Sequence, residues 1–252
     1  MLSLLLSVSV DFSQYDYAQE SSRQGGGSNA SSLYAPYVKT GEIYIIDDFE
    51  SGEIWSWDQK RLTLKVTKDA AKSGRFGLLT ILPESTPSGK IWKRNLNVHG
   101  YYYLSFWIKV EGLANLGSQT YGGRAIKVEV QFDSDGDGLV SRWWYPILPV
   151  DLKEGQWKRF CLRIFGDDKL VGGAGSDFRG DFGRRDVDQD EKPGTPYQPT
   201  PDSKLVNFYA KIYRAENSPM GVVKVYWDDI ILSKKPIYEY EGRKLPEGKG
   251  GK

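Results

Sequence analysis

Apolar and polar residues alternate along much of the chain, which is the period of a β-strand with one buried face. The pattern predicts nine strands, each rich in β-branched and aromatic residues and bounded by Gly, Pro, Asp or Asn, at residues 42–49, 62–66, 77–82, 102–110, 126–132, 142–148, 158–165, 206–213 and 222–232. No segment combines sustained helical periodicity with caps. We therefore predict an all-β fold, a jelly-roll β-sandwich over residues 41–235.

The amino terminus shows the same alternation. The apolar positions are Leu2, Leu4, Leu6, Val8, Val10 and Phe12, and most residues between them are polar. A positively charged region and a small-residue cleavage site are both missing, so we interpret residues 1–17 as an extended strand and not as a signal peptide. Residues 18–40 are predicted to be a flexible linker. A lone strand leaves its backbone groups unpaired, so it completes a sheet either in its own domain or in a neighbouring subunit.

Two further segments depart from the strand pattern. Residues 166–204 contain few apolar side chains and form a long irregular loop inserted in the sandwich, and a loop of that length is either disordered or functional. Residues 236–252 are predicted to be a C-terminal tail.

Composition excludes several classes of function. The 34 basic residues nearly balance the 33 acidic ones, which gives no footprint for nucleic acid. No apolar run approaches the roughly 18–20 residues that span a bilayer. His99 is the single histidine and Cys161 the single cysteine, which excludes intrachain disulfides and multi-histidine metal sites. One His, one Cys and two Met beside many Lys, Arg, Asp and Glu is also a composition typical of proteins from hot environments.

Alternating aspartates occur twice and suggest Ca²⁺. The first cluster is Asp133, Asp135 and Asp137, followed by a glycine as in the start of an EF-hand loop, although Trp144 occupies the position of the bidentate Glu. The second cluster is Asp186, Asp188 and Asp190, inside the long loop. A hairpin turn for the first cluster and ion pairing with Arg184 and Arg185 for the second remain open alternatives.

Four motifs together resemble jelly-roll carbohydrate-binding modules: D-D-F-E-x-G at 47–52, Y-Y-L-S-F-W-I-K at 102–109, G-Q-W-K-R-F at 155–160 and W-D-D-I at 227–230. The resemblance implies a structural calcium held by acidic groups of the first and last strands. Carried over by position, its ligands are Glu50 and Asp229, with Asp48 and Asp228 behind them.

The N-terminal strand, the Gly/Ser linker and the aspartate clusters also resemble the cannula subunits of hyperthermophilic archaea, which assemble into extracellular tubules. That resemblance implies a structural protein that is extracellular, binds calcium and donates residues 1–12 to the next copy of itself, in a contact that need not close.

The alternative is a calcium-containing carbohydrate-binding module, for which aromatic side chains are available at Trp55, Trp57, Trp92, Trp143, Trp144 and Tyr145. Most aromatics in such a β protein belong to the core or to cross-strand pairs. No spacing selects a pair of catalytic carboxylates, so we predict no enzyme and no catalytic residue.

Overall fold

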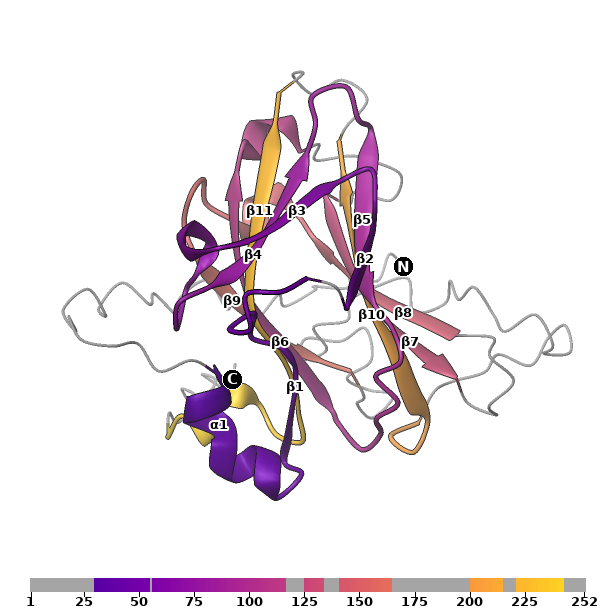
Figure 1. Ribbon diagram of the computed structural model, residues 1–252. Coiled ribbons are helices and arrows are strands. Elements are labelled where there is room, and N and C mark those ends of the chain that lie inside the picture. Colours follow the sequence, from indigo (N-terminus) through magenta and orange to yellow (C-terminus); the bar gives the residue numbers. More distant parts are fainter. Residues whose placement is uncertain are drawn as a thin grey trace, which may run out of the picture.

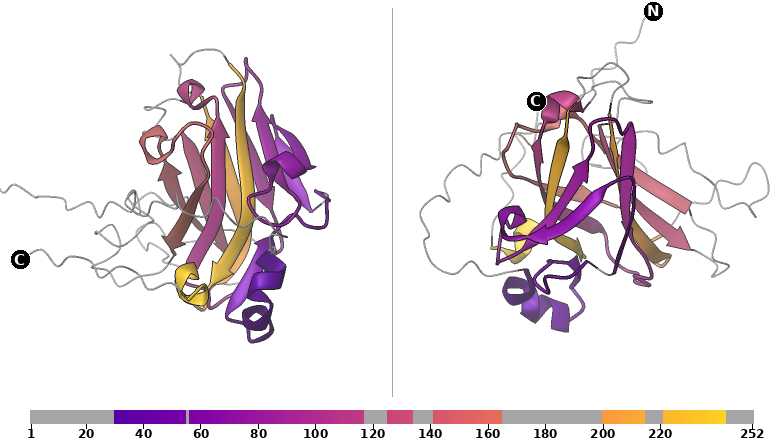
Figure 2. Two further views of the ribbon diagram at one scale, coloured as in Figure 1. Left: turned by 90° about the vertical axis from the view of Figure 1, so that its left-hand side faces the viewer. Right: turned by 45° about the horizontal axis from the view of Figure 1, so that its top comes forward.

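The computed structural model describes residues 30–54, 56–116, 125–133, 141–164, 200–214 and 221–242. Within them, two antiparallel sheets face each other and confirm the predicted all-β sandwich (Figures 1 and 2). Sheet A contains β1 (Ile43–Asp47), β3 (Thr63–Thr67), β4 (Gly77–Leu82), β6 (Tyr103–Glu111), β9 (Lys158–Arg163) and β11 (Val223–Ser233). Sheet B contains β2 (Trp57–Lys60), β5 (Ser88–Lys93), β7 (Ile126–Asp133), β8 (Ser141–Ile147) and β10 (Lys204–Tyr213).

The order of the strands is that of a jelly roll. Sheet A runs β3-β4-β11-β6-β9, with β1 beside β11, and sheet B runs β2-β5-β10-β7-β8. Only the connections β3–β4 and β7–β8 join neighbours of one sheet, and every other connection between consecutive described strands crosses to the opposite sheet. Residues far apart in the sequence are therefore brought together, as where β11 lies between β4 and β6.

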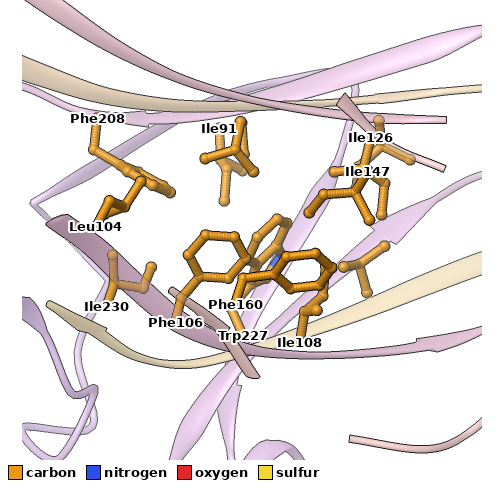
Figure 3. Packing of buried hydrophobic residues seen from close by; sticks show 14 of the residues in the cluster. Ile91, Leu104, Phe106, Ile108, Ile126, Ile147, Phe160, Phe208, Trp227 and Ile230 are labelled. Carbon is orange, nitrogen blue, oxygen red and sulfur yellow. The ribbon is translucent and has the colours of Figure 1, made fainter. Parts of the chain in front are cut away.

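The core lies between the sheets. Figure 3 shows side chains of sheet B facing those of sheet A across the interior, with Phe208 and Ile91 opposite Leu104 and Phe106. Phe106 is fully buried, and its ring lies 5.6 Å from that of Phe160 and 5.7 Å from that of Trp227. Burial of this continuous apolar layer supplies the main driving force for folding.

Helical segments occur where the sequence predicted only a linker and a tail. Within the predicted 18–40 linker, residues 30–39 form the helix α1 (Ala30–Lys39), and the predicted 236–252 tail begins with α2 (Ile237–Tyr240). Tyr34 of α1 and Ile237 of α2 are buried with Ile43 and Ile231 in a second apolar cluster. Residues 30–39 are therefore part of the folded body, because this contact supplies the packing that a helix of that length lacks alone.

Three short 3₁₀ turns complete the described elements: η2 (Lys68–Ala70), η3 (Leu113–Asn115) and η4 (Pro149–Asp151). Among the described helices, none is long and apolar enough to cross a membrane. The predicted donor strand at residues 1–17 and residues 166–199 of the predicted 166–204 loop lie outside the described residues, and β10 begins at the last residue of that loop, Lys204.

Candidate functional site

Acidic residues of the last strand hold one end of the loop at residues 71–76. One carboxylate oxygen of Asp228 accepts hydrogen bonds from the backbone N–H groups of Lys72, at 2.7 Å, and Ser73, at 2.9 Å. The Ser73 hydroxyl donates to the carboxylate of Asp229, with its oxygens at 3.1 and 3.0 Å. Asp228 and Asp229 sit at a bulge of β11, and Asp229 has a φ of 47°. The bulge turns two consecutive carboxylates towards the same loop.

Glu50 holds the other end of this loop. Its Oε1 accepts the backbone N–H groups of Arg75, at 2.7 Å, and Phe76, at 2.9 Å, and Asp48 accepts the N–H of Glu50 at 3.3 Å. The positions predicted from the first and last strands thus do lie around one loop. Within the described ranges, however, no three or more His, Cys, Asp and Glu side chains gather in a way that could hold a metal ion.

The pair Asp228–Asp229 is electrostatically unusual, because the two neighbouring acidic residues are 0 % and 5 % exposed. Burial and the neighbouring Asp229 charge raise the pKa of Asp228 to about 8, against the lowering effect of its hydrogen bonds with the backbone of Ser73, Lys72 and Asp229. Oxygen ligands of this kind suit Ca²⁺, which takes about six to eight of them, so two carboxylates would be only part of a site. Calcium binding by Glu50, Asp229, Asp48 and Asp228 therefore stays a prediction.

The two aspartate clusters are mostly beyond the described residues. Asp133 lies at the end of β7, opposite Lys204 of β10 in the register. The described residues do not include Asp135, Asp137, Asp186, Asp188 and Asp190. Calcium binding by either cluster is likewise a prediction.

The outward face of sheet B gathers a different set of residues. Along β5, β10 and β7 every second side chain enters the core, and the alternate ones face away from it. The register places Trp92 beside Tyr209 and Tyr209 beside Glu129. Asp58 of β2 extends this line at one side, and the backbone of residue 144 on β8 extends it at the other. We call this line, which runs through Asp58, Trp92, Tyr209 and Glu129, the aromatic row.

The two rings of the aromatic row lie against each other. The centroids of Trp92 and Tyr209 are 5.8 Å apart, with an angle of 20° between the ring planes. The Lys90 ammonium lies 4.9 Å from the Trp92 ring and 5.1 Å from the Tyr209 ring, and the Arg94 guanidinium lies 5.4 Å from the Trp92 ring. Both rings are half-buried, so neither belongs to the core.

A chain of polar side chains continues from the aromatic row. Asn207 donates to the Oε1 of Gln131 at 2.8 Å, Gln131 donates to Glu129 at 2.5 Å, and the Lys127 ammonium lies 2.6 Å from the same carboxylate. Glu129 is 3 % exposed and Gln131 8 % exposed. We call these four residues the polar chain; because each member holds the next, its donors and acceptors are fixed in place.

Next to the aromatic row is a line of lysines. Lys60 of β2 is opposite Lys90 of β5, Lys90 is opposite Lys211 of β10, and Lys211 is opposite Lys127 of β7. Burial lowers the pKa of Lys211, the charges of Lys90 and Arg61 lower it further, and Glu129 raises it. We call Lys60, Lys90, Lys211 and Lys127 the lysine row.

The structure shows which of the aromatic residues named from the sequence belong to the core and which face outward. Trp57 is 7 % exposed and packs against Phe49 and Phe208 in the core. Trp143 and Tyr145 also pack against the core, whereas Trp55 is not among the described residues. Trp92 is the candidate whose described side chain faces outward.

Sequence reasoning missed Tyr209 and the polar chain. The available signal was the alternation in 206–213, where Phe208, Ala210 and Ile212 would face inward and leave Tyr209 with Lys211 on the other face. The pairing of that strand with β5 and β7 could not be read from one sequence, because both partners are distant in the chain.

Comparisons with known proteins give only remote similarities. No family model matches the chain, and no curated protein matches it. A family 11 carbohydrate-binding module from Clostridium thermocellum, solved with a mixed-linked tetrasaccharide, has a TM-score of 0.46 and 16% identity over 76% of this chain and 95% of that one. The cellulose induced protein Cip1 has a TM-score of 0.44 and 15% identity over 75% and 96% of the two chains. An exo-beta-agarase has a TM-score of 0.46 and 12% identity over 77% of this chain and 25% of its own. Similarity at this level identifies neither a ligand of this chain nor the role of any of its residues.

Proposed function

We propose that the chain is a carbohydrate-binding domain, and that the outward face of sheet B is its binding surface. The observation that carries the proposal is the placement of two neighbouring aromatic rings, Trp92 and Tyr209, directly beside a fixed chain of polar side chains. A sugar ring has an apolar face, which stacks on an aromatic ring, and a rim of hydroxyl groups, which need hydrogen-bonding partners. The aromatic row supplies the rings. The half-buried ends of the polar chain, Asn207 and Lys127, supply the hydrogen-bonding partners, and the buried Gln131 and Glu129 hold them in place.

The polar chain also suits this role energetically. Glu129 and Gln131 are held by their neighbours before any ligand arrives. Preorganised groups of this kind lose little conformational entropy on binding. The same residues would contribute nothing to core packing, since they face away from the core on strands whose alternate residues fill it.

The spacing of the carboxylates on this face favours binding without catalysis. Asp58 and Glu129 lie on strands separated by three strand-to-strand steps, which at about 4.8 Å each amounts to roughly 14 Å. Glycoside hydrolysis uses carboxyl pairs about 5–9.5 Å apart. We therefore propose a non-catalytic role for this face.

Substitution of the rings tests the proposal. Trp92→Ala should weaken binding to a polysaccharide panel about tenfold or more, because a stacked aromatic at the centre of a site acts as a binding hot spot. Trp157→Ala is the matched control: Trp157 is also a half-buried tryptophan, but its ring contacts Tyr226 of sheet A. Affinity electrophoresis and isothermal titration calorimetry measure the effect. Equal binding by the wild type and Trp92→Ala would refute the proposal.

Self-assembly is a separate proposal that rests on the sequence. The donor segment Leu2, Leu4, Leu6, Val8, Val10 and Phe12 is not among the described residues. If this strand completes the sheet of the next copy, deletion of residues 1–12 leaves a folded monomer. Negative-stain microscopy of the full chain and the deletion, with calcium added or chelated, tests this; tubules formed by the deletion variant would exclude strand donation.

A further inference from the structure

The lysine row concentrates positive charge across the outward face of sheet B. Lys60, Lys90, Lys211 and Lys127 follow one another in register over four neighbouring strands. Side chains that are directly opposite on one sheet face are close, and like charges in that position destabilise the sheet. Four lysines side by side across the sheet therefore lower the stability of the fold, and the fold alone does not explain why they are there.

Among the described residues, the carboxylates of this face pair with Lys127, at one end of the lysine row, and with Arg94, outside it. Glu129 pairs with Lys127 at 2.6 Å, and Asp58 pairs with Arg94 at 2.8 Å. Lys60, Lys90 and Lys211 form no ion pair with any carboxylate among the described residues. Burial is the main cause of the lowered pKa of Lys211; beyond it, the charges of Lys90 and Arg61 lower this pKa against the raising effect of Glu129.

The excess charge adjoins the proposed sugar surface. The Lys90 ammonium lies within 5.1 Å of both the Trp92 and the Tyr209 ring. A cation over a half-buried ring is held weakly compared with a fully desolvated one. A ligand that takes the ring face can therefore displace it, and the freed ammonium can pair with an anionic group on that ligand.

We propose that the glycan bound by this face is acidic, a polysaccharide whose uronate or sulfate groups pair with Lys60, Lys90 and Lys211 while a sugar ring stacks on Trp92 and Tyr209. This inference rests on the proposed function. A nucleic acid would also offer anions and rings, but the polar chain beside the rings favours a ligand whose rings carry several hydroxyl groups, and the nearly balanced charge of the chain gives no footprint for nucleic acid.

The test compares polysaccharides that share a backbone and differ in charge. Polygalacturonate is paired with its fully methyl-esterified form, and carboxymethylcellulose with hydroxyethylcellulose. We expect the wild type to bind at least one acidic member about tenfold more tightly than its neutral counterpart, with an affinity that falls as salt is added. An oligothymidylate serves as a further probe.

A charge variant identifies the surface. In the variant Lys60→Gln, Lys90→Gln, Lys211→Gln, binding to the acidic member should fall about tenfold or more, because three screened charge pairs are lost. The control variant Lys65→Gln, Lys68→Gln, Lys234→Gln removes the same charge from exposed lysines on or next to strands of sheet A and should bind like the wild type.

The outcomes separate the two proposals. Equal affinity for charged and neutral members, still lost in Trp92→Ala, overturns the acidic specificity and leaves the carbohydrate site standing. Absence of binding to every polysaccharide overturns both. Tighter binding of the oligothymidylate, lost in the lysine variant, overturns the glycan in favour of single-stranded nucleic acid, whose bases also stack on aromatic side chains.

Discussion

At the scale of single residues, burial decides what a carboxylate does in this protein. Asp58 is exposed and pairs with Arg94, also exposed, so it contributes little to stability. Asp228 is fully buried beside Asp229 and holds the backbone of Lys72 and Ser73. Of Asp58 and Asp228, the buried one is the carboxyl whose titration makes stability depend on pH.

The raised pKa of Asp228 determines whether stability rises or falls with pH. The carboxyl has an ordinary value of 3.8 and a value of about 8 in the folded chain, so between about pH 4 and 8 the folded state holds a proton that the unfolded state has released. The contribution of Asp228 to the free energy of unfolding is therefore full below about pH 4 and is lost as pH rises through about 8. Between these values the free energy of unfolding falls by at most about 1.4 kcal/mol per pH unit. Urea unfolding in EDTA buffers measures it.

The matched variants for this experiment are Asp228→Asn and Asp58→Asn. The first removes the titrating group and should flatten the decline of unfolding free energy between about pH 4 and 8. The second removes an exposed aspartate and should leave the decline as it is in the wild type. A decline of equal slope in Asp228→Asn would show that other groups cause it.

The predicted calcium site can be tested at the same residues. A cation bound beside Asp228 and Asp229 would displace the proton that Asp228 holds at neutral pH and balance both negative charges, so added Ca²⁺ should raise the melting temperature of the wild type. Asp229→Asn should abolish that increase, while Asp58→Asn should retain it. Differential scanning calorimetry with and without Ca²⁺ decides the matter, and an unchanged melting temperature of the wild type would contradict a calcium site here.

At the scale of elements, a buried polar contact joins the two helices to sheet A. Arg159 of β9 is 8 % exposed; its guanidinium lies 2.5 Å from the Glu241 carboxylate and 3.1 Å from the hydroxyl of Tyr34 in α1. Tyr34 in turn donates to Glu241 at 2.6 Å. Residues 34, 159 and 241 thus bring three distant segments to one point.

Removing one charge of this contact should be costly. Glu241→Gln leaves the Arg159 guanidinium buried without its carboxylate, and we expect a loss of about 3 kcal/mol in the free energy of unfolding. The double variant Arg159→Met, Glu241→Gln should recover part of the loss, because the guanidinium that Glu241 balances is gone. The recovery is only partial, because Asp229 also loses the nearby Arg159 charge. Urea titrations of both variants measure the difference; a double variant no more stable than the single one would contradict this account.

The elements also show how far one sequence predicts the fold. The nine predicted strands correspond to β1, β3, β4 and β6–β11, because each has an apolar face of sufficient length. The strands β2 and β5 were missed, since Ser88–Lys93 carries only Ile91 as an aliphatic residue and contains a glycine. Gly89 is required there, because a Cβ at this position would lie 2.4 Å from the Leu62 side chain. That contact depends on tertiary structure and leaves no periodic signal.

The candidate site was less predictable than the fold for the same reason. Trp92 could be named as an aromatic candidate, but it lies on the missed strand β5. Its neighbours Tyr209 and Glu129 come from strands more than thirty residues away. A surface assembled by cross-strand register is visible only once the order β2-β5-β10-β7-β8 is known.

At the scale of the whole molecule, the residues that stabilise the sandwich lie apart from the residues that we propose to bind the ligand. Phe106 lies between the sheets and contacts Phe160 and Trp227, whereas Trp92 lies on the outward face of sheet B. The inner face of sheet A and the outward face of sheet B therefore have different roles, and substitutions on them should have separable effects.

Phe106→Ala should lower the free energy of unfolding by about 3–5 kcal/mol, through lost burial and a cavity between the sheets. Trp92→Ala should lower it by less, about 1–2 kcal/mol, because its ring is only half-buried and loses mainly the stacking on Tyr209. Glycan affinity, measured at a temperature where both variants are folded, should show the reverse order: retained in Phe106→Ala and lost in Trp92→Ala. The comparison needs only urea titrations and calorimetry on the same preparations. If Trp92→Ala instead unfolded as readily as Phe106→Ala, its ring would be part of the core, and its effect on binding would say nothing about a surface site.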